Sequence, residues 1–199
     1  MLIHNYDYLN VSFFFDKIEK VKSSVSQVYK NSLSKFKIKQ LHSLPGNLKE
    51  LGFINPISGG AHKPMFYIWN NLEHQNLTFF ISNYEDGLVN LTKNIAEKSR
   101  CELVDIALSN DLKFPKYLFR KVLLDGNQRY IQLIKDSKRE FSESGPSLPY
   151  EKLVEGHKSS FKDNFSNQII ISLLEYEGID LKYLFTKNDE GYSFERIEW

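Results

Sequence analysis

Two glycines closely followed by a lysine form the pattern in this sequence that most suggests ligand binding. Residues 58 to 63 read Ser-Gly-Gly-Ala-His-Lys. Glycines let backbone N–H groups approach an anion, and a lysine adds a positive charge. A phosphate-binding P-loop needs a hydroxyl after its lysine, whereas Pro64 follows here. The pattern therefore favours a plain surface loop. The alternative is a small enzyme or nucleotide-binding domain whose site includes Gly59, Gly60, His62 and Lys63.

The single cysteine and the scattered histidines do not form a recognisable catalytic or metal-binding pattern. Cys101 with His62 or His157 would be the parts of a cysteine hydrolase, because a thiolate nucleophile needs a nearby base. An isolated cysteine between a predicted helix and a predicted strand is more typical of a small buried apolar group. The five histidines lack the His-x-x-x-His and His-x-His spacings. We therefore expect no catalytic residue, no metal and no cofactor, and we favour a chain that is not an enzyme.

Acidic residues gather near the C-terminus. Residues 163 to 199 hold eight acids against three bases, whereas residues 1 to 60 hold eight lysines against four acids. The two regions either pack against each other and cancel, which we favour, or form two binding surfaces. In the second case the candidate partner-binding residues are Glu175, Glu177 and Asp180. The net charge of +1 argues against a nucleic acid partner, because nucleic acid-binding domains are usually basic.

Composition indicates a folded chain in a reducing compartment. Hydrophobic residues make up 41% and aromatic residues 14% of the sequence, which excludes a disordered chain. No run approaches the roughly 18 to 20 apolar residues that cross a bilayer, so we expect no membrane partner. The first residues lack the pattern of a secretory signal, and a single cysteine forms no internal disulfide, so we expect a cytoplasmic location. The abundance of Asn, Lys, Ile, Phe and Tyr suggests an A/T-rich gene, often seen in bacteria and phages.

Apolar residues at steps of three and four predict amphipathic helices. The predicted helices cover residues 16 to 31, 86 to 99 and 165 to 177. The candidate N-caps are Asp86, Gly87 or Asn90 for the second of these helices and Asp163 or Asn164 for the third.

Alternating and aromatic runs predict strands. The predicted strands cover residues 35 to 39, 65 to 69, 77 to 81, 101 to 108, 117 to 124, 129 to 133 and 139 to 142. Asp125-Gly126-Asn127 predicts a hairpin turn, because Asp-Gly readily adopts the positive φ angles that such turns require. The tail is predicted to end in a hairpin of residues 183 to 185 against residues 192 to 197.

These elements predict an α+β fold. We expect a single domain over residues 1 to 199, with a mainly antiparallel meander sheet and two or three amphipathic helices. Residues 42 to 64 are rich in glycine and proline and form the candidate internal boundary.

The C-terminal part resembles a known family in the order of its elements. Strand residues 129 to 133 and 139 to 143 precede Gly145-Pro146-Ser147-Leu148-Pro149-Tyr150-Glu151, and a helix follows that ends in Leu173-Leu174-Glu175-Tyr176-Glu177-Gly178-Ile179. This order, over about the last 75 residues, is similar to the C-terminal layout of small bacterial immunity proteins of polymorphic toxin systems. The resemblance implies a protein that binds and blocks a cognate toxin and needs no active site.

The leading hypothesis is therefore a non-enzymatic protein-binding module, an immunity or antitoxin-like inhibitor of a cognate bacterial toxin. Its expected contact regions are the loop of residues 42 to 64 and the acidic segment after Asp163, since acids complement a basic toxin. One alternative is the enzyme or nucleotide-binding domain that uses the loop from Gly59 to Lys63. Another is a structural subunit of a phage or defence assembly.

Overall fold

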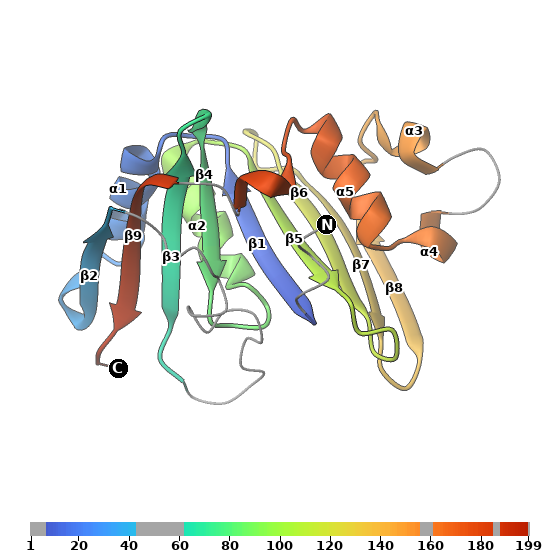
Figure 1. Cartoon of the computed structure of the whole chain (residues 1–199), viewed down its shortest axis with the longest axis horizontal. Coiled ribbons are helices and arrows are strands. Elements are labelled where there is room, and N and C mark those ends of the chain that lie inside the picture. Colours follow the sequence, from blue (N-terminus) through green and yellow to red (C-terminus); the bar gives the residue numbers. More distant parts are fainter. Residues whose placement is uncertain (1–6, 43–61, 156–160, 185–187, 199) are drawn as a thin grey trace.

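The strands of the described chain form one nine-stranded sheet in the order β2-β9-β3-β4-β1-β5-β6-β7-β8 (Figure 1). The computed structural model describes residues 7–42, 62–155, 161–184 and 188–198. The strands are β1 (Tyr8–Phe14), β2 (Phe36–Leu41), β3 (Met65–Asn71), β4 (His74–Ser82), β5 (Leu103–Ser109), β6 (Lys116–Val122), β7 (Gln128–Lys135), β8 (Arg139–Ser144) and β9 (Asn188–Arg196). All neighbouring strands pair antiparallel, and β5 to β8 form a meander. The predicted α+β class is confirmed.

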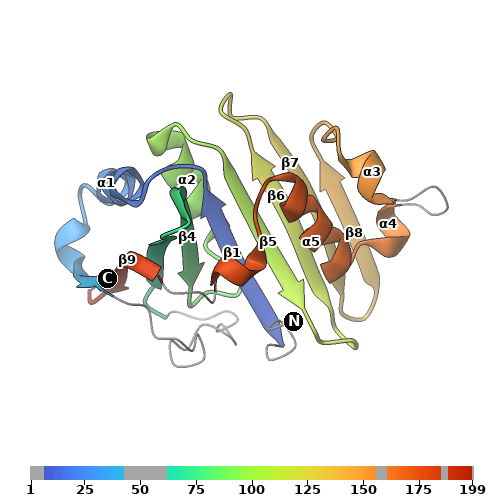
Figure 2. The same cartoon turned by 45° about the horizontal axis from the view of Figure 1, so that its top comes forward.

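Helices pack on both faces of this sheet but cover different parts of it (Figures 1 and 2). The helices are α1 (Ile18–Val28), α2 (Val89–Ser99), α3 (Glu151–Glu155), α4 (Phe161–Asn164) and α5 (Asn167–Tyr176), with short 3-10 segments η2 (Leu33–Lys35) and η4 (Leu181–Leu184). Helices α1 and α2 lie on one face, here called the α2 face, and α3 to α5 with η4 lie on the opposite face, the α5 face.

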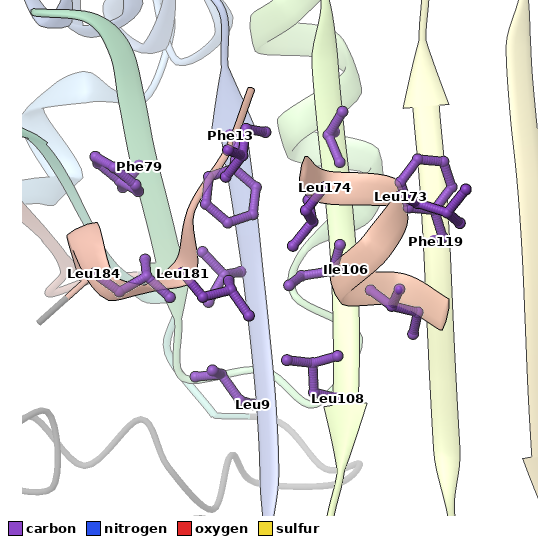
Figure 3. Close-up of a cluster of buried hydrophobic side chains, with 14 of the residues drawn as sticks. Leu9, Phe13, Phe79, Ile106, Leu108, Phe119, Leu173, Leu174, Leu181 and Leu184 are labelled. Carbon is purple, nitrogen blue, oxygen red and sulfur yellow. The ribbon is translucent and has the colours of Figure 1, made fainter. Parts of the chain in front are cut away.

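Each face has its own hydrophobic core. On the α5 face, Leu173 and Leu174 of α5 pack over Ile106 and Phe119, while η4 extends the same cluster toward Phe79 (Figure 3). On the α2 face, the apolar sides of α1 and α2 pack on the other side chains of the same strands. Each fully buried Leu or Phe of this kind stabilises the fold by roughly 1.5 to 3 kcal/mol. The strands under both cores are therefore fixed in position.

The central strand β1 is absent from the predicted elements. It pairs with β4 on one side and β5 on the other. Its Phe13 enters the core of the α5 face and its neighbour Phe14 enters the core of the α2 face. A strand buried on both faces lacks the apolar and polar alternation that identifies half-buried strands.

The predicted tail hairpin is wrong. Residues 181 to 184 form η4 instead of a strand, because Leu181 and Leu184 turn toward the core of the α5 face. Strand β9 pairs with β2 and β3, which come from far earlier in the chain. In that pairing Lys37 stands opposite Glu195, and Gln40 donates a hydrogen bond to Glu190 at 2.9 Å. Part of the basic N-terminal region therefore lies directly beside part of the acidic tail.

The predicted helix caps also differ from the structure. Helix α2 begins after Leu88, which occupies the N-cap position. Asp86 accepts a hydrogen bond from the Leu88 N–H at 3.0 Å, whereas an N-cap side chain would bond an N–H within the first turn of the helix. Helix α5 begins after Ser166, because Asn164 belongs to the separate helix α4. The turn at Gly126 is confirmed, with φ of +83°. Gly178, at φ of +74°, follows the end of α5 as expected.

The candidate boundary at residues 42 to 64 separates segments of one sheet. Strands β1 and β2 precede this loop, yet β1 lies between β4 and β5, and β2 pairs with β9. Residues 43 to 61 of the loop lie outside the described residues. Among the helices of the described chain, none has the length and apolar character needed to cross a membrane.

Candidate functional site

The predicted glycine loop is described only at its end. Gly59 and Gly60 lie outside the described residues. The His62 ring stacks on the Tyr84 ring with centroids 4.0 Å apart, and the Tyr84 hydroxyl donates to the His62 carbonyl. The Lys63 ammonium donates to the Ile197 carbonyl. Both side chains thus contact other parts of the chain, and a ligand at this loop stays a prediction.

The three acidic residues predicted to bind a partner lie in different environments. Glu175 and Asp180 are exposed, and Asp180 pairs with Lys182 at 2.9 Å. The side chain of Glu177 is only 6% exposed, since it accepts hydrogen bonds from Lys121 at 2.6 and 2.8 Å and from the Tyr150 hydroxyl. Burial, together with this hydrogen bond, raises the pKa of Tyr150. The carboxylate of Glu177 therefore joins α5 to β6, and its role in partner binding stays a prediction.

Cys101 is the small buried group that its sequence context indicates. The residue is 6% exposed and belongs to the core of the α2 face. Burial raises the pKa of its thiol to about 11. A thiolate nucleophile needs the opposite shift. This environment counts against the cysteine hydrolase hypothesis.

We expect Cys101 to react with iodoacetamide at pH 8 about a hundredfold more slowly than free cysteine, because little thiolate forms and burial limits access. The reaction is followed by intact mass. In urea the rate should rise to that of free cysteine. Fast alkylation of the folded chain would instead indicate an activated thiol.

On the α2 face the described helices stop near β6: Arg120 and Val122 of β6 are buried beside α2, whereas no described helix lies over β7 and β8 on this face. On β6, β7 and β8 the side chains of this face alternate with those that pack against α5. Figure 1 shows α1 and α2 behind the other half of the sheet. We call this region the open face; it consists of the half-buried Tyr130, Gln132 and Ile134 and the exposed Glu140 and Ser142, with the buried Leu118 beside them.

One row of side chains runs straight across the open face and continues under α2. Asn10, Ala107, Leu118, Gln132 and Ser142 stand opposite one another in register on β1, β5, β6, β7 and β8. The small side chain of Ala107 lies between two larger ones, so the row dips at this point. The dip lies at the place where the helix layer ends.

A hollow of about 430 Å³ occupies this dip. Its floor includes Tyr8, Asn10, Ala107, Leu118, Tyr130 and Gln132. Its walls include Tyr84, Glu85, Asp86, Val89, Lys116 and Ile134. Small-molecule sites typically have volumes of about 300 to 1,000 Å³ and combine apolar walls with a few polar groups. The hollow therefore has the size and composition of a site for a small ligand or for one side chain of a partner.

The loop before α2 closes one side of the hollow in a constrained conformation. Gly87 and Leu88 both have positive φ, of 66° and 56°. The Glu85 carbonyl accepts hydrogen bonds from the Tyr8 hydroxyl and from Asn10 Nδ2, each at 3.1 Å. Burial raises the pKa of Tyr8 to about 12, so this hydroxyl keeps its proton. A left-handed leucine costs about 1 to 2 kcal/mol, and such strain is often found at functional sites.

Gly87 packs tightly against the Asn10 side chain, which lines the hollow, and adding a methyl group at Gly87 tests this contact. A Cβ at Gly87 would come 2.3 Å from Asn10 Oδ1, whereas a Cβ at Gly126 meets nothing within 4 Å. Both glycines have positive φ. We expect Gly126→Ala to cost about 1 to 2 kcal/mol and Gly87→Ala at least about 1 kcal/mol more, by urea unfolding. Equal losses would show that Asn10 moves aside freely.

A buried ion pair lies beneath the edge of the hollow. The Asp105 side chain is fully buried and accepts hydrogen bonds from Ser12 at 2.6 Å, Thr92 at 3.0 Å and Arg120 Nε at 2.7 Å. Arg120 also donates to the Val89 carbonyl at 2.7 Å. The cluster therefore ties the first turn of α2 to the three strands below it and fixes one wall of the hollow.

A second, polar hollow of about 660 Å³ lies at the β2 side of the sheet. Its lining residues are Lys17, Glu19, Gln40, His42, Asn70, Gln75 and Glu190. The Glu190 carboxylate accepts hydrogen bonds from Gln40 and from the Tyr192 hydroxyl. Within the described ranges, no three His, Cys, Asp or Glu side chains gather as metal ligands would. This hollow lacks the apolar walls of the first one and is the weaker candidate.

The hollow was not predicted from the sequence because its parts are distant in the chain. One signal was present: Asn10 and Asp105 interrupt otherwise apolar segments, and β1 and β5 place them on the same face. Without the pairing of β1 with β5, these positions cannot be related. No family model, curated protein or solved structure matches the chain.

Proposed function

We propose that this chain is a non-enzymatic protein-binding module that contacts its partner with the open face and the hollow beside it. The observation that carries the proposal is the uncovered part of the α2 face. There Leu118, Tyr130 and Ile134 line a hollow whose rim bears Glu85 and Lys116. Apolar and aromatic groups surrounded by polar ones are typical of the energetically important part of an interface.

The ion pairing of the buried acids supports a binding role over a catalytic one. The buried acids Asp105, Glu151 and Glu177 pair with Arg120, Arg129 and Lys121 at distances of 2.6 to 2.8 Å. Catalytic acids and bases usually have an accessible side and a perturbed pKa. Two of these pairs join α3 and the end of α5 to the sheet, and the cluster around Asp105 joins α2 to it, so these charges hold the fold together.

Within the class of binding modules we propose an immunity or antitoxin-type inhibitor of a cognate bacterial toxin, acting in the cytoplasm. This narrower proposal depends on the resemblance of the C-terminal layout. In the structure β7 and β8 precede the segment of residues 145 to 150 and α5 follows, with α3 and α4 between. A subunit of a phage or defence assembly would use the same kind of surface and remains the second candidate.

The proposal is tested by filling the hollow. The tagged chain is used to capture its partner from the native host at near-physiological salt, which screens weak long-range attraction. Ile134→Trp places an indole in the wall of the hollow, and the matched control Lys135→Trp places one on the next residue of β7, on the opposite face. We expect a stoichiometric partner that binds the parent and the control equally and binds Ile134→Trp at least about tenfold more weakly.

Equal binding by both tryptophan variants would reject the open face as the interface. No stoichiometric partner for the folded chain would reject the binding-module proposal. Growth tests then separate the two binding roles. An inhibitor should rescue cells that the captured partner arrests when expressed alone, whereas a partner without toxicity would favour the assembly subunit.

A further inference from the structure

The turn between β5 and β6 carries the most exposed large apolar side chain of the described residues (Figure 1). Leu112 is 88% exposed, and Phe114, two residues later, is 42% exposed. We call residues 111 to 114 the tip. The Leu112 side chain contributes almost nothing to the core of its own chain, so it has apolar surface to bury against another molecule.

Hydrogen bonds restrain the tip. The Asp111 carboxylate accepts hydrogen bonds from the backbone N–H groups of Lys113 at 2.8 Å and Phe114 at 3.0 Å. Just after the tip, the Pro115 carbonyl accepts one from the Lys135 N–H at 3.0 Å, which ties the turn to β7. Since a preformed loop loses little conformational freedom when it binds, its exposed side chains are well suited to serve as anchors.

The tip lies at the end of the sheet where the hollow lies. Phe114 comes two residues before Lys116, which lines the hollow. Pro115, between them, is buried, so the alternation of strand side chains places Phe114 on the same side as Lys116. Tyr8, another lining residue, stands opposite Ser109, the last residue of β5 before the turn. The tip and the hollow are therefore neighbours on one surface.

The lining of the hollow suits an apolar side chain. It includes Val89, Ala107, Leu118 and Ile134 together with tyrosine rings, and the hollow has a volume of about 430 Å³. Leu112 does not fill the hollow of its own chain, because it is 88% exposed. Insertion of a leucine from a second copy would remove apolar surface of both copies from water, which favours association.

The charges of the tip and of the hollow are complementary. Lys113 lies between the two apolar residues of the tip and is exposed, and Asp86 is an exposed residue of the lining. Among the described residues, neither Lys113 nor Asp86 forms an ion pair. The other acid of the lining, Glu85, already pairs with Lys116. A lysine from a second copy would therefore meet an acid that has no counter-charge.

We infer that two copies of this chain form a two-fold dimer in which the tip of each copy enters the hollow of the other. A surface that carries both a protrusion and a matching recess is complementary to itself, and two-fold symmetry makes each such contact twice. Leu112 of one copy then lies in the apolar lining of the other, with Lys113 beside Asp86 of that copy. The hollow is also the proposed contact of the partner, so the dimer closes this site until the partner takes it.

Sedimentation equilibrium of the full-length chain tests the dimer. Between about 1 and 500 µM we expect the average mass to rise from that of one chain toward that of two, as for a Kd in the micromolar range. Leu112→Asp should weaken self-association at least about tenfold, because it places a carboxylate in an apolar lining. The matched control is Leu124→Asp, since Leu124 is also exposed but follows β6, at the other end of the sheet. This control should associate like the parent.

Two variants of β7 locate the contact. Ile134→Trp places an indole where the tip would lie and should weaken self-association at least about tenfold. Lys135→Trp places an indole on the opposite face of the same strand and should leave self-association unchanged.

Exchange of the complementary charges gives a test that a change of fold could not imitate. Lys113→Glu and Asp86→Lys should each weaken self-association about fivefold, because each brings like charges together. The double variant restores a pair of opposite charges and should recover most of the loss. Urea unfolding curves of the single variants confirm that the fold is retained.

A chain that stays monomeric at about 500 µM would overturn the inference. A dimer that Leu112→Asp and Ile134→Trp leave intact would overturn it as well, because its contact would lie elsewhere. If Leu112→Asp instead weakens capture of the partner by a monomeric chain, the tip belongs to the partner interface and the inference is wrong. None of these results rejects the proposed function, since a monomeric chain still presents the open face to a partner.

Discussion

Asp105→Ala is expected to destabilise the fold by about 3 to 5 kcal/mol, because it leaves the Arg120 guanidinium buried without its counter-charge. The Asp105 side chain is fully buried and that of Arg120 is 6% exposed, and their charged groups lie 2.6 Å apart. Ser12 would lose its acceptor as well, and Thr92 would lose one of its two acceptors. Since these groups join α2 to β1, β5 and β6, the loss affects the centre of the molecule.

Urea unfolding followed by circular dichroism measures this loss. Asp180→Ala is the control, because Asp180 is exposed; we expect a loss of at most about 1 kcal/mol, from its ion pair with Lys182 and the hydrogen bond that it accepts from the Lys182 N–H. The double variant Asp105→Leu with Arg120→Met removes both charges and should be more stable than Asp105→Ala. If Asp105→Ala unfolds at the midpoint of the parent, the ion pair does not stabilise the fold.

Glu177→Lys is expected to cost a similar amount, about 3 to 5 kcal/mol, because it places a second cation against the partly buried Lys121. The Lys121 side chain is 11% exposed, and apart from Glu177 its ion-pair partner is Glu102, at 3.2 Å. The Tyr150 hydroxyl would also lose its acceptor. The end of α5 and the segment around Tyr150 should therefore detach from β6 together.

Glu175→Lys is the matched control for this substitution. It makes the same charge change two residues earlier, in the last turn of α5, but Glu175 is exposed. We expect native stability for Glu175→Lys in urea and a large loss for Glu177→Lys. Equal, small effects would show that the carboxylate of Glu177 is free to serve a partner, as its position in the acidic segment suggests.

The helices could be predicted because their signal is local. Ile18, Val21 and Val25 of α1 recur at helical spacing, and all three are buried in the core of the α2 face. The apolar positions of α5 likewise pack on the α5 face. The meander of β5 to β8 could be predicted for the same reason, since each of its strands pairs with the next one in the chain.

The strands with distant partners could not be placed in the same way. Strand β9 lies between β2 and β3, and neither partner is adjacent to it in the sequence. Strand β1 is buried on both faces and precedes α1 closely, so its apolar run merges with the helical pattern. These two strands determine the order of the whole sheet.

The residues of the candidate site come together only through this strand order, so the sequence alone could not predict the site. Asn10 and Ala107 meet Leu118 and Gln132 only because β1 pairs with β5 and β5 with β6. The predicted site residues were selected from local patterns instead. Of these, Glu177 stabilises the fold, and Lys63 is bonded to the Ile197 carbonyl.

Hydrogen–deuterium exchange of the chain alone and in complex with its partner measures most directly whether the partner covers the open face and the hollow. We expect slower exchange in the complex for residues 84 to 89 and along β6 and β7, where backbone amides lie beside the hollow. Residues 161 to 176, on the far side of the sheet, should be unaffected. Protection confined to the acidic segment after Asp163, with unchanged exchange at residues 84 to 89, would show that the partner binds elsewhere and not at the open face.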